Sequence, residues 1–229
     1  VEKPQELVRF EWKGSFSGNA SSFGGDAGNY FSYPMYKDLR DRNQVFSGML
    51  ATTRANVGLA WHNQAKDEHA ELVSGNYFQV LGLRPAAGRL FTSADETASG
   101  ANAAAVLSYD EWRTRFDGSR EVIGQALRVN GHPFTIVGVA PENFRTAIGG
   151  YRPAVFLPVT MVDIAIPWTA PIHRYDNRQS IWLTIVARRK PGISIEQAQA
   201  AMGPLWRALR ASELPLYKEA SQKFRERYV

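Results

Sequence analysis

Alternating apolar and polar residues predict strands at several separated places in the chain. In residues 6–12 ("ELVRFEW") every second residue is Val, Phe or Trp, which is the period-2 pattern of a half-buried strand. Three short alternating stretches at 49–53, 56–61 and 69–74 predict a three-stranded meander. Other apolar runs predict a strand that enters a helix within 103–118, and strands at 154–161 and 180–189.

Residues 126–139 carry the strongest turn signal in the chain. A short strand at 126–129 is followed by Asn130-Gly131 and by the β-branched run "PFTIVGV". A two-residue type I′ turn needs positive φ at both central residues, which Asn tolerates and Gly accepts freely. The sequence therefore predicts a β-hairpin here, with Pro141 ending its second strand.

Helical spacing and capping residues predict four helices. Ser32 precedes a helix with Pro34 in its first turn, and a short helix at 77–81 ends at Gly82. Two capping boxes are predicted, Ser108 with Glu111 and Ser194 with Gln197. The last helix, within 191–212, carries an apolar stripe and a Gly203-Pro204 pair that predicts a kink near Ala201. The stripe consists of Ile195, Ala198, Met202, Leu205 and Leu209.

Strands and helices follow one another without strict βα alternation, which favours an α+β fold over a doubly wound α/β sheet. Residues 13–31 are rich in Gly, Ser and Asn and predict a mobile loop. The 229 residues, 44% of them hydrophobic, suffice for one sizeable core or two small ones. No apolar run reaches the length of a membrane span, and the charged start does not resemble a signal peptide. The abrupt ends favour a piece of a longer protein.

The net charge of +5 is confined to the end of the chain. Residues 1–76 carry −1, residues 77–177 carry 0 and residues 178–229 carry +6. Such a basic segment is compatible with nucleic-acid binding, with a position over anionic lipid headgroups, or with a solvated helical face, the interpretation that we favour. The absence of cysteine excludes disulfides, thiolate nucleophiles and Cys-based zinc sites.

The search for catalytic chemistry finds no candidate site. His62 and His69 flank a predicted turn and could face each other across it, but surface histidines are the favoured interpretation over a metal site; His132 and His173 have no partners at ligand spacing. Asp110 and Glu111 are adjacent and point to different faces of their helix. No nucleophile elbow, phosphate loop or dinucleotide fingerprint occurs. We predict no catalytic, cofactor-binding or metal-binding residues.

Several stretches, taken in order, resemble one family. They are "FSYPMYKDLRDRNQVFSGM" (31–49), "VSGNYFQVLGLRPAAGRLF" (73–91), 105–145, "AVFLPVTM" (154–161) and "WLTIVARRKPGISIEQAQAAM" (182–202). Together they resemble the MacB-like periplasmic core domain of bacterial ABC-transporter permeases of the FtsX-like group, with the closest likeness to acidobacterial-type permeases. The segment "VNGHPFTIVGVAPENFR" (129–145) is the best marker of this likeness.

The resemblance implies a fold of two subdomains on the periplasmic side of the inner membrane. Residues 1–76 and 178–229 would form a discontinuous porter-like subdomain, and 77–177 a smaller α/β insert. The domain would be a non-catalytic mechanotransmission element between transmembrane helices. Its partners would be those helices, a cytoplasmic ATPase that binds ATP, a second permease copy and a periplasmic adaptor or envelope protein, with the basic C-terminal segment near lipid headgroups.

Two other function classes were weighed against this one. An envelope or secreted hydrolase with an unrecognised active site is the alternative; it predicts paired carboxylates, or a histidine beside a carboxylate, at the base of a deep pocket. A nucleic-acid-binding module predicts salt-sensitive DNA binding through Arg188, Arg189 and Lys190. We expect no nucleic-acid partner, because the aromatic residues are not interleaved with the basic ones.

Overall fold

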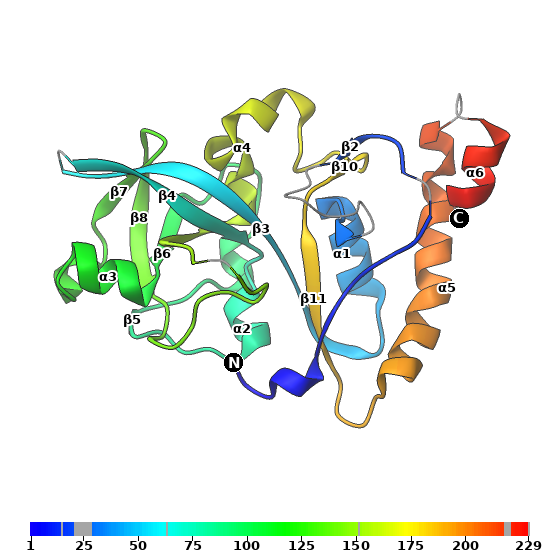
Figure 1. Ribbon diagram of the computed structural model, residues 1–229, viewed down its shortest axis with the longest axis horizontal. Coiled ribbons are helices and arrows are strands. Elements are labelled where there is room, and N and C mark those ends of the chain that lie inside the picture. The colour runs from blue at the N-terminus through cyan, green and yellow to red at the C-terminus, as the bar shows by residue number, and fades with distance from the viewer. Residues whose placement is uncertain (15, 21–28, 63, 151, 218–220, 229) are drawn as a thin grey trace. The chain divides into compact units, whose positions relative to one another are not determined.

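The structure is a computed structural model that describes residues 1–229 except 15, 21–28, 63, 151, 218–220 and 229. The chain forms two compact units (Figure 1). Unit 1 contains Val1–Pro4 and Leu50–Tyr175, and unit 2 contains Gln5–Met49 and Asp176–Val229. Both units mix helices with strands, so the predicted α+β class is confirmed.

The expected subdomains, 1–76 with 178–229 and 77–177, differ from these units mainly in residues 50–76. Those residues form most of β3 (Phe46–Trp61) and all of β4 (Gln64–Val73). β4 pairs in parallel with β9 (Val155–Pro158). The hydrogen bonds of this ladder join residues 50–76 to the middle of the chain, and this stretch therefore belongs to unit 1.

Unit 1 is built on a mixed sheet with the strand order β3-β4-β9-β6-β8-β5, in which β7 pairs with both β3 and β8. The remaining strands are β5 (Ala87–Gly88), β6 (Ala104–Leu107), β7 (Ala126–Val129) and β8 (His132–Val139). The β4–β9 and β6–β8 pairs are parallel. β6 and β9 are buried along their whole length, which explains their uninterrupted apolar sequences, because strands covered on both faces lose the alternating pattern.

The predicted three-stranded meander is wrong. Residues 49–53 and 56–61 belong to one continuous strand, β3, and 69–74 extends backwards to form β4. The two strands pair antiparallel from Thr52 opposite Val73 to Trp61 opposite Gln64. The alternation is interrupted at 54–55, but neither Arg54 nor Ala55 disfavours extended backbone, so nothing ends the strand there.

The predicted hairpin is confirmed as β7 and β8. Asn130 and Gly131 have φ of 48° and 83°, and the flanking residues Val129 and His132 pair directly. Positive φ at both central positions is what the type I′ turn requires. The sequence signal therefore fixed the register of these strands as well as their existence.

Asn130 also connects the turn to two other elements. Its backbone N–H donates to the carbonyl of Gly58 at 2.9 Å, and its Oδ1 accepts from the N–H of Gly58 at 2.8 Å. Its Nδ2 donates to the carbonyls of Ile164 at 2.9 Å and Ala165 at 3.3 Å. A residue selected by turn geometry thus holds the hairpin against β3 and against the helix that contains Ile164.

The helices of unit 1 are short. They are α2 (Tyr77–Leu81), α3 (Tyr109–Arg115), α4 (Val162–Ala165) and the 3₁₀ turns η3 (Ser93–Asp95), η4 (Arg120–Val122), η5 (Val159–Met161) and η6 (Pro167–Ile172). As predicted, α2 ends at Gly82, which has φ of 68°. At the start of α3 the Ser108 side chain accepts from the N–H of Glu111, but the Glu111 carboxylate pairs with Arg115, so one half of the predicted capping box is formed. Tyr77 and Phe78 of α2 pack in the core against Phe144 and Phe156, with ring centroids 5.3–6.3 Å apart.

Unit 2 combines both ends of the chain. β1 (Leu7–Arg9) pairs antiparallel with β11 (Thr184–Arg189), and β11 neighbours the first residues of β3. β2 (Asn19–Ala20) pairs in parallel with β10 (Ser180–Ile181); of the predicted 13–31 loop, 15 and 21–28 lie outside the described residues. Its other elements are η1 (Pro4–Glu6), α1 (Tyr33–Arg42), α5 (Ile195–Glu213), η7 (Leu214–Tyr217) and α6 (Gln222–Tyr228).

Helix α5 begins as predicted and continues further. Ser194 and Gln197 form a reciprocal capping box. The helix is continuous through Pro204, and the kink near Ala201 stays a prediction. Ala198, Met202 and Leu209 of the predicted stripe are buried, whereas Ile195 is 48% exposed. No helix among the described residues is both long and apolar enough to cross a bilayer.

Gly138 of β8 offers a test of this packing. The main chain of Arg89 passes so close that a Cβ added at Gly138 would overlap it. We expect Gly138→Ala to lower the free energy of unfolding by about 1–3 kcal/mol, because the backbones of β8 and β5 must move apart. Urea unfolding followed by circular dichroism measures the change.

Gly58→Ala is the matched control, because it is also a strand glycine. An added Cβ there would lie no closer than 3.7 Å to its neighbours, so we expect its stability to stay within about 0.5 kcal/mol of the wild type. Equal stability losses in the two variants would contradict the packing of β8 described above.

Candidate functional site

The candidate functional site lies on β3, the strand that contributes residues to both units. Residues 46–49 of this strand belong to unit 2 and residues 50–61 to unit 1. Met49, Leu50 and Ala51, which span the boundary, are fully buried. Buried main-chain groups need hydrogen-bond partners, and the partners of β3 on each side of the boundary define the site.

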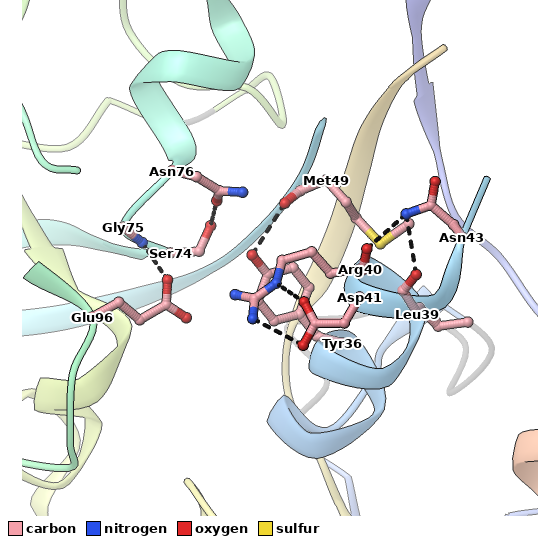
Figure 2. A network of polar contacts seen from close by, with 10 residues as sticks. All are labelled: Tyr36, Leu39, Arg40, Asp41, Asn43, Met49, Ser74, Gly75, Asn76 and Glu96. Atoms are coloured by element: carbon pink, nitrogen blue, oxygen red, sulfur yellow. Dashed lines mark hydrogen bonds and ion pairs between the residues drawn. The ribbon is translucent and has the colours of Figure 1, made fainter. Parts of the chain in front are cut away.

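On the unit 2 side, helix α1 holds the strand through Tyr36 and Asn43 (Figure 2). The Tyr36 hydroxyl, in a side chain with no solvent exposure, donates to the carbonyl of Met49 at 3.1 Å. Asn43 follows α1; its Nδ2 donates to the carbonyl of Arg40 at 2.8 Å, and its Oδ1 accepts from the N–H of Phe46 at 2.9 Å. The C-terminus of α1 is thereby joined to the first residue of β3.

On the unit 1 side, Ser74 holds the strand through two bonds to Ala51. The N–H of Ser74 donates to the Ala51 carbonyl at 2.9 Å, and the N–H of Ala51 donates to Ser74 Oγ at 3.0 Å. Ser74 Oγ in turn donates to Asn76 Oδ1 at 2.8 Å, and the N–H of Gly75 donates to Glu96 Oε2 at 2.6 Å (Figure 2). Each unit therefore holds its own end of the boundary segment by side-chain and main-chain hydrogen bonds.

A buried carboxyl group lies three residues further along this ladder, where Glu71 stands opposite Arg54. Glu71 has no solvent exposure, and its Oε1 accepts from Thr52 Oγ1 at 2.7 Å and from the Tyr77 hydroxyl at 2.9 Å. The Tyr77 oxygen itself accepts from the N–H of Ala147 at 3.0 Å. Burial raises the pKa of Glu71 to about 7, although its hydroxyl donors oppose the shift.

Unit 2 also contains an apolar groove of about 440 Å³ between residues 8–13 and helix α5. Its lining includes the aromatic residues Phe10, Trp12, Phe31, Phe46 and Trp206. Glu11 is the only acidic residue among those that line it. The paired carboxylates that a hydrolase would need are therefore not found in this groove.

The histidines do not assemble into a site. His62 lies in the turn after β3, whereas His69 stands opposite Asn56 in the β3–β4 ladder, with its Nδ1 2.8 Å from Asn56 Oδ1. The hypothesis that His62 and His69 face each other is therefore wrong, because the hairpin is longer than predicted. His132 and His173 are exposed. No group of three potential metal ligands occurs among the described residues.

The other charged residues considered from sequence have separate partners. Asp110 pairs with Arg145 at 3.2 Å, and Glu111 pairs with Arg115 at 2.7 Å, so the two adjacent carboxylates do not act as a pair. Of the basic residues 188–190, Arg188 pairs with Glu6 at 3.1 Å, and the Arg189 guanidinium donates to the carbonyls of Gln5 and Ile193. Two of these three cations are therefore engaged within the chain.

Sequence reasoning did not find Tyr36, Ser74 or Glu71. Tyr36 and Ser74 are common residue types whose role depends on which carbonyl or amide lies opposite them in space. Glu71 does carry a signal, since it interrupts the apolar end of β4, "AELV", at a position where both neighbours are buried. A charged residue in such a run is expected to be paired, hydrogen-bonded or protonated.

Comparison with known proteins identifies the scaffold. The family model of the MacB-like periplasmic core domain matches residues 6–205. The chain belongs to this family. Its fold resembles the periplasmic region of MacB from Actinobacillus actinomycetemcomitans, with a TM-score of 0.63 and 17% identity, covering 93% of this chain and 88% of that one.

Two further proteins resemble this chain. The extracellular domain of the noncanonic ABC-type transporter YknZ from Gram-positive bacteria gives a TM-score of 0.62 at 14% identity, covering 90% of this chain and 94% of that one. The macrolide export ATP-binding/permease protein MacB of Escherichia coli (strain K12) is 26% identical over 181 residues, 77% of this chain. The chain spans about a quarter of the length of that relative.

The buried carboxyl of this MacB-like domain can be tested by pH. Glu71→Gln keeps an oxygen acceptor but cannot ionise. In the wild type, the folded state retains its proton up to about pH 7, while the ordinary value is 4.5. The carboxyl therefore lowers the free energy of unfolding as the pH rises between these values, by a total on the order of 3 kcal/mol.

We therefore expect the variant to gain stability relative to the wild type between pH 4.5 and 7.5, and the difference to be constant above that range. Urea unfolding at several pH values measures it. Glu142→Gln removes an exposed carboxylate from the same unit and controls for the loss of one charge. A stability difference between Glu71→Gln and the wild type that does not change with pH would contradict the buried, protonated Glu71.

Proposed function

We propose that this MacB-like domain is the extracytoplasmic part of an ABC-transporter permease and couples the ATP-driven motion of transmembrane helices to export or to a periplasmic partner. In this proposal the domain itself performs no chemistry. ATP would bind to a separate cytoplasmic domain or subunit, and the permease would work as a dimer at the inner membrane, with a periplasmic adaptor or envelope protein as a further partner. Unit 2 would correspond to the porter-like part and unit 1 to the insert.

One observation carries the proposal: β3 passes through both units and is held by hydrogen bonds on each side of the boundary. A displacement of unit 2 would act on β3 through Tyr36 and Asn43, and β3 would act on unit 1 through the bonds of Ala51 and Thr52. A strand pulled along its axis transmits force through covalent bonds. Force transmission through β3 therefore needs no catalytic group.

The charge of unit 2 supports a position close to the membrane. Unit 2 contains 15 Lys and Arg against 10 Asp and Glu, whereas unit 1 contains 12 of each. Three of the cations, Lys223, Arg225 and Arg227, are exposed on the terminal helix α6. Basic residues next to a bilayer gain about 1 kcal/mol each from anionic headgroups.

The coupling proposal is tested in the complete permease that contains this domain. Spin labels on exposed positions Glu142 of unit 1 and Ala208 of unit 2 report the distance between the units by electron double resonance. We expect the distance distribution to change when ATP is added. A label pair within unit 1, Glu142 with Arg120, is expected to stay constant.

Tyr36→Phe removes the hydroxyl that holds Met49, and we expect it to reduce the ATP-dependent change by about half or more while ATP hydrolysis is retained. Tyr33→Phe, in the same helix, is the matched control, because the bond between Tyr36 and Met49 remains. No ATP-dependent change in the wild type, or equal changes in the two variants, would contradict the proposed route through β3.

The membrane proposal is tested with the 229-residue chain and lipid vesicles. We expect the chain to sediment with vesicles containing anionic lipid at low salt and to be released at high salt, because the attraction is electrostatic. Replacement of Lys223, Arg225 and Arg227 by Gln should weaken binding by roughly 100-fold, given about 1 kcal/mol per cation.

The control variant replaces three exposed cations of unit 1, Arg84, Arg120 and Arg152, by Gln. It is expected to bind anionic vesicles as the wild type does. Equal weakening in both triple variants would mean that net charge alone matters, and binding to neutral vesicles would contradict the electrostatic origin.

A further inference from the structure

The groove of unit 2 contains none of the hydrogen-bonding side chains of the proposed coupling through β3, and its composition is unusual for a surface. Residues 8–13 form one wall and helix α5 forms the other, while Phe31, Leu39 and Phe46 complete the lining. The volume of about 440 Å³ lies in the range of small-molecule sites, which are concave and mostly apolar. The groove lies wholly within unit 2.

The aromatic rings of the groove pack against one another. Phe10 lies 5.3 Å from Phe46, and Trp206 lies 5.7 Å from both Trp12 and Phe31, measured between ring centroids. Contacts in this range are the favourable edge and tilted arrangements of aromatic pairs. The apolar wall is therefore formed before any ligand arrives, which lowers the ordering cost of binding.

The groove is open to solvent at its α5 end. Ile195, the first residue of the helix, lines the groove and is 48% exposed, and Phe10 is only partly buried. Ile195 and Leu216 are the large exposed aliphatic residues of unit 2 among those described, and only Ile195 lines the groove. An apolar chain entering here would cover Ile195 and remove it from water.

The charged residues at the groove favour an anion. Arg9 and Lys13 line it and are exposed, and neither forms an ion pair within the described part of the chain; Glu11 is the one opposing carboxylate. The two cations therefore give the exposed edge of this apolar groove a net positive charge.

We propose that this groove binds an anionic amphiphile of the long-chain carboxylate class. The alkyl chain would lie against Phe10, Trp206 and Ile195, and the carboxylate would lie toward Arg9 and Lys13. An alkyl chain gains about 0.8 kcal/mol for each CH₂ that leaves water, and the two cations would distinguish it from a cationic amphiphile of equal length. The proposal goes beyond force transmission, which needs no ligand, so the two can fail separately.

The test uses the 229-residue chain and dodecanoate below its micelle concentration, with binding measured by titration calorimetry. We expect saturable 1:1 binding, and at least tenfold weaker binding of dodecyltrimethylammonium, which has the same chain and the opposite charge. Replacement of both Arg9 and Lys13 by Gln should remove most of this preference. Equal affinity for the two amphiphiles, or no saturable binding of dodecanoate, would overturn the proposal.

Ile195→Glu places a carboxylate at the mouth and is expected to weaken dodecanoate binding at least tenfold. Leu216→Glu is the matched control, because Leu216 is 50% exposed in the same unit and does not line the groove. Unchanged melting temperatures of both variants verify that they fold. Equal affinities of the two variants for dodecanoate would show that it binds outside the groove.

Two further measurements locate the ligand. A dodecanoate brominated at its terminal carbon is expected to quench Trp12 and Trp206, so Trp206→Phe should reduce the quenching more than Trp168→Phe, a change at an exposed tryptophan of unit 1. Light scattering gives the oligomeric state. A dimer that Ile195→Glu dissociates would show that a second copy occupies the groove, and the ligand proposal would be wrong.

Discussion

The structure around β3 depends on one constraint: its buried main-chain groups need hydrogen-bond partners. The strand crosses from unit 2 to unit 1 at residues with no access to water, so every amide and carbonyl there must find a partner inside the protein. Tyr36 and Ser74 supply these partners from opposite sides of the boundary in sequence. The placement of α1 and of the segment after β4 follows from this requirement.

Local chemistry determines the parts of the fold that sequence predicts well. The Asn130-Gly131 turn, the capping box at Ser194 and the end of α2 at Gly82 each depend on a few neighbouring residues and on backbone angles that few residue types adopt. The resemblance of several ordered stretches identified the family, and the family model confirms it over residues 6–205.

The features that could not be predicted from sequence depend on pairing between segments that lie far apart in the chain. The length of β3 was missed because a strand ends where its partner ends, and its partner β4 was itself predicted too short. The division of the chain depends on β4 pairing with β9, two strands separated by about 80 residues. The groove was missed for the same reason, since Phe10, Phe46 and Trp206 come from three distant segments.

The arrangement of the units along the chain has a consequence for the order in which they fold. Nearly all of unit 1 is one uninterrupted segment, whereas unit 2 is completed only by residues that follow Asp176. During synthesis the N-terminal half of unit 2 therefore emerges long before β11 and α5. Its apolar residues have no packing partners from β11 and α5 while the sheet of unit 1 forms. Unit 1 is therefore complete while the second half of unit 2 is still to be synthesised, and unit 2 is the last of the two to close.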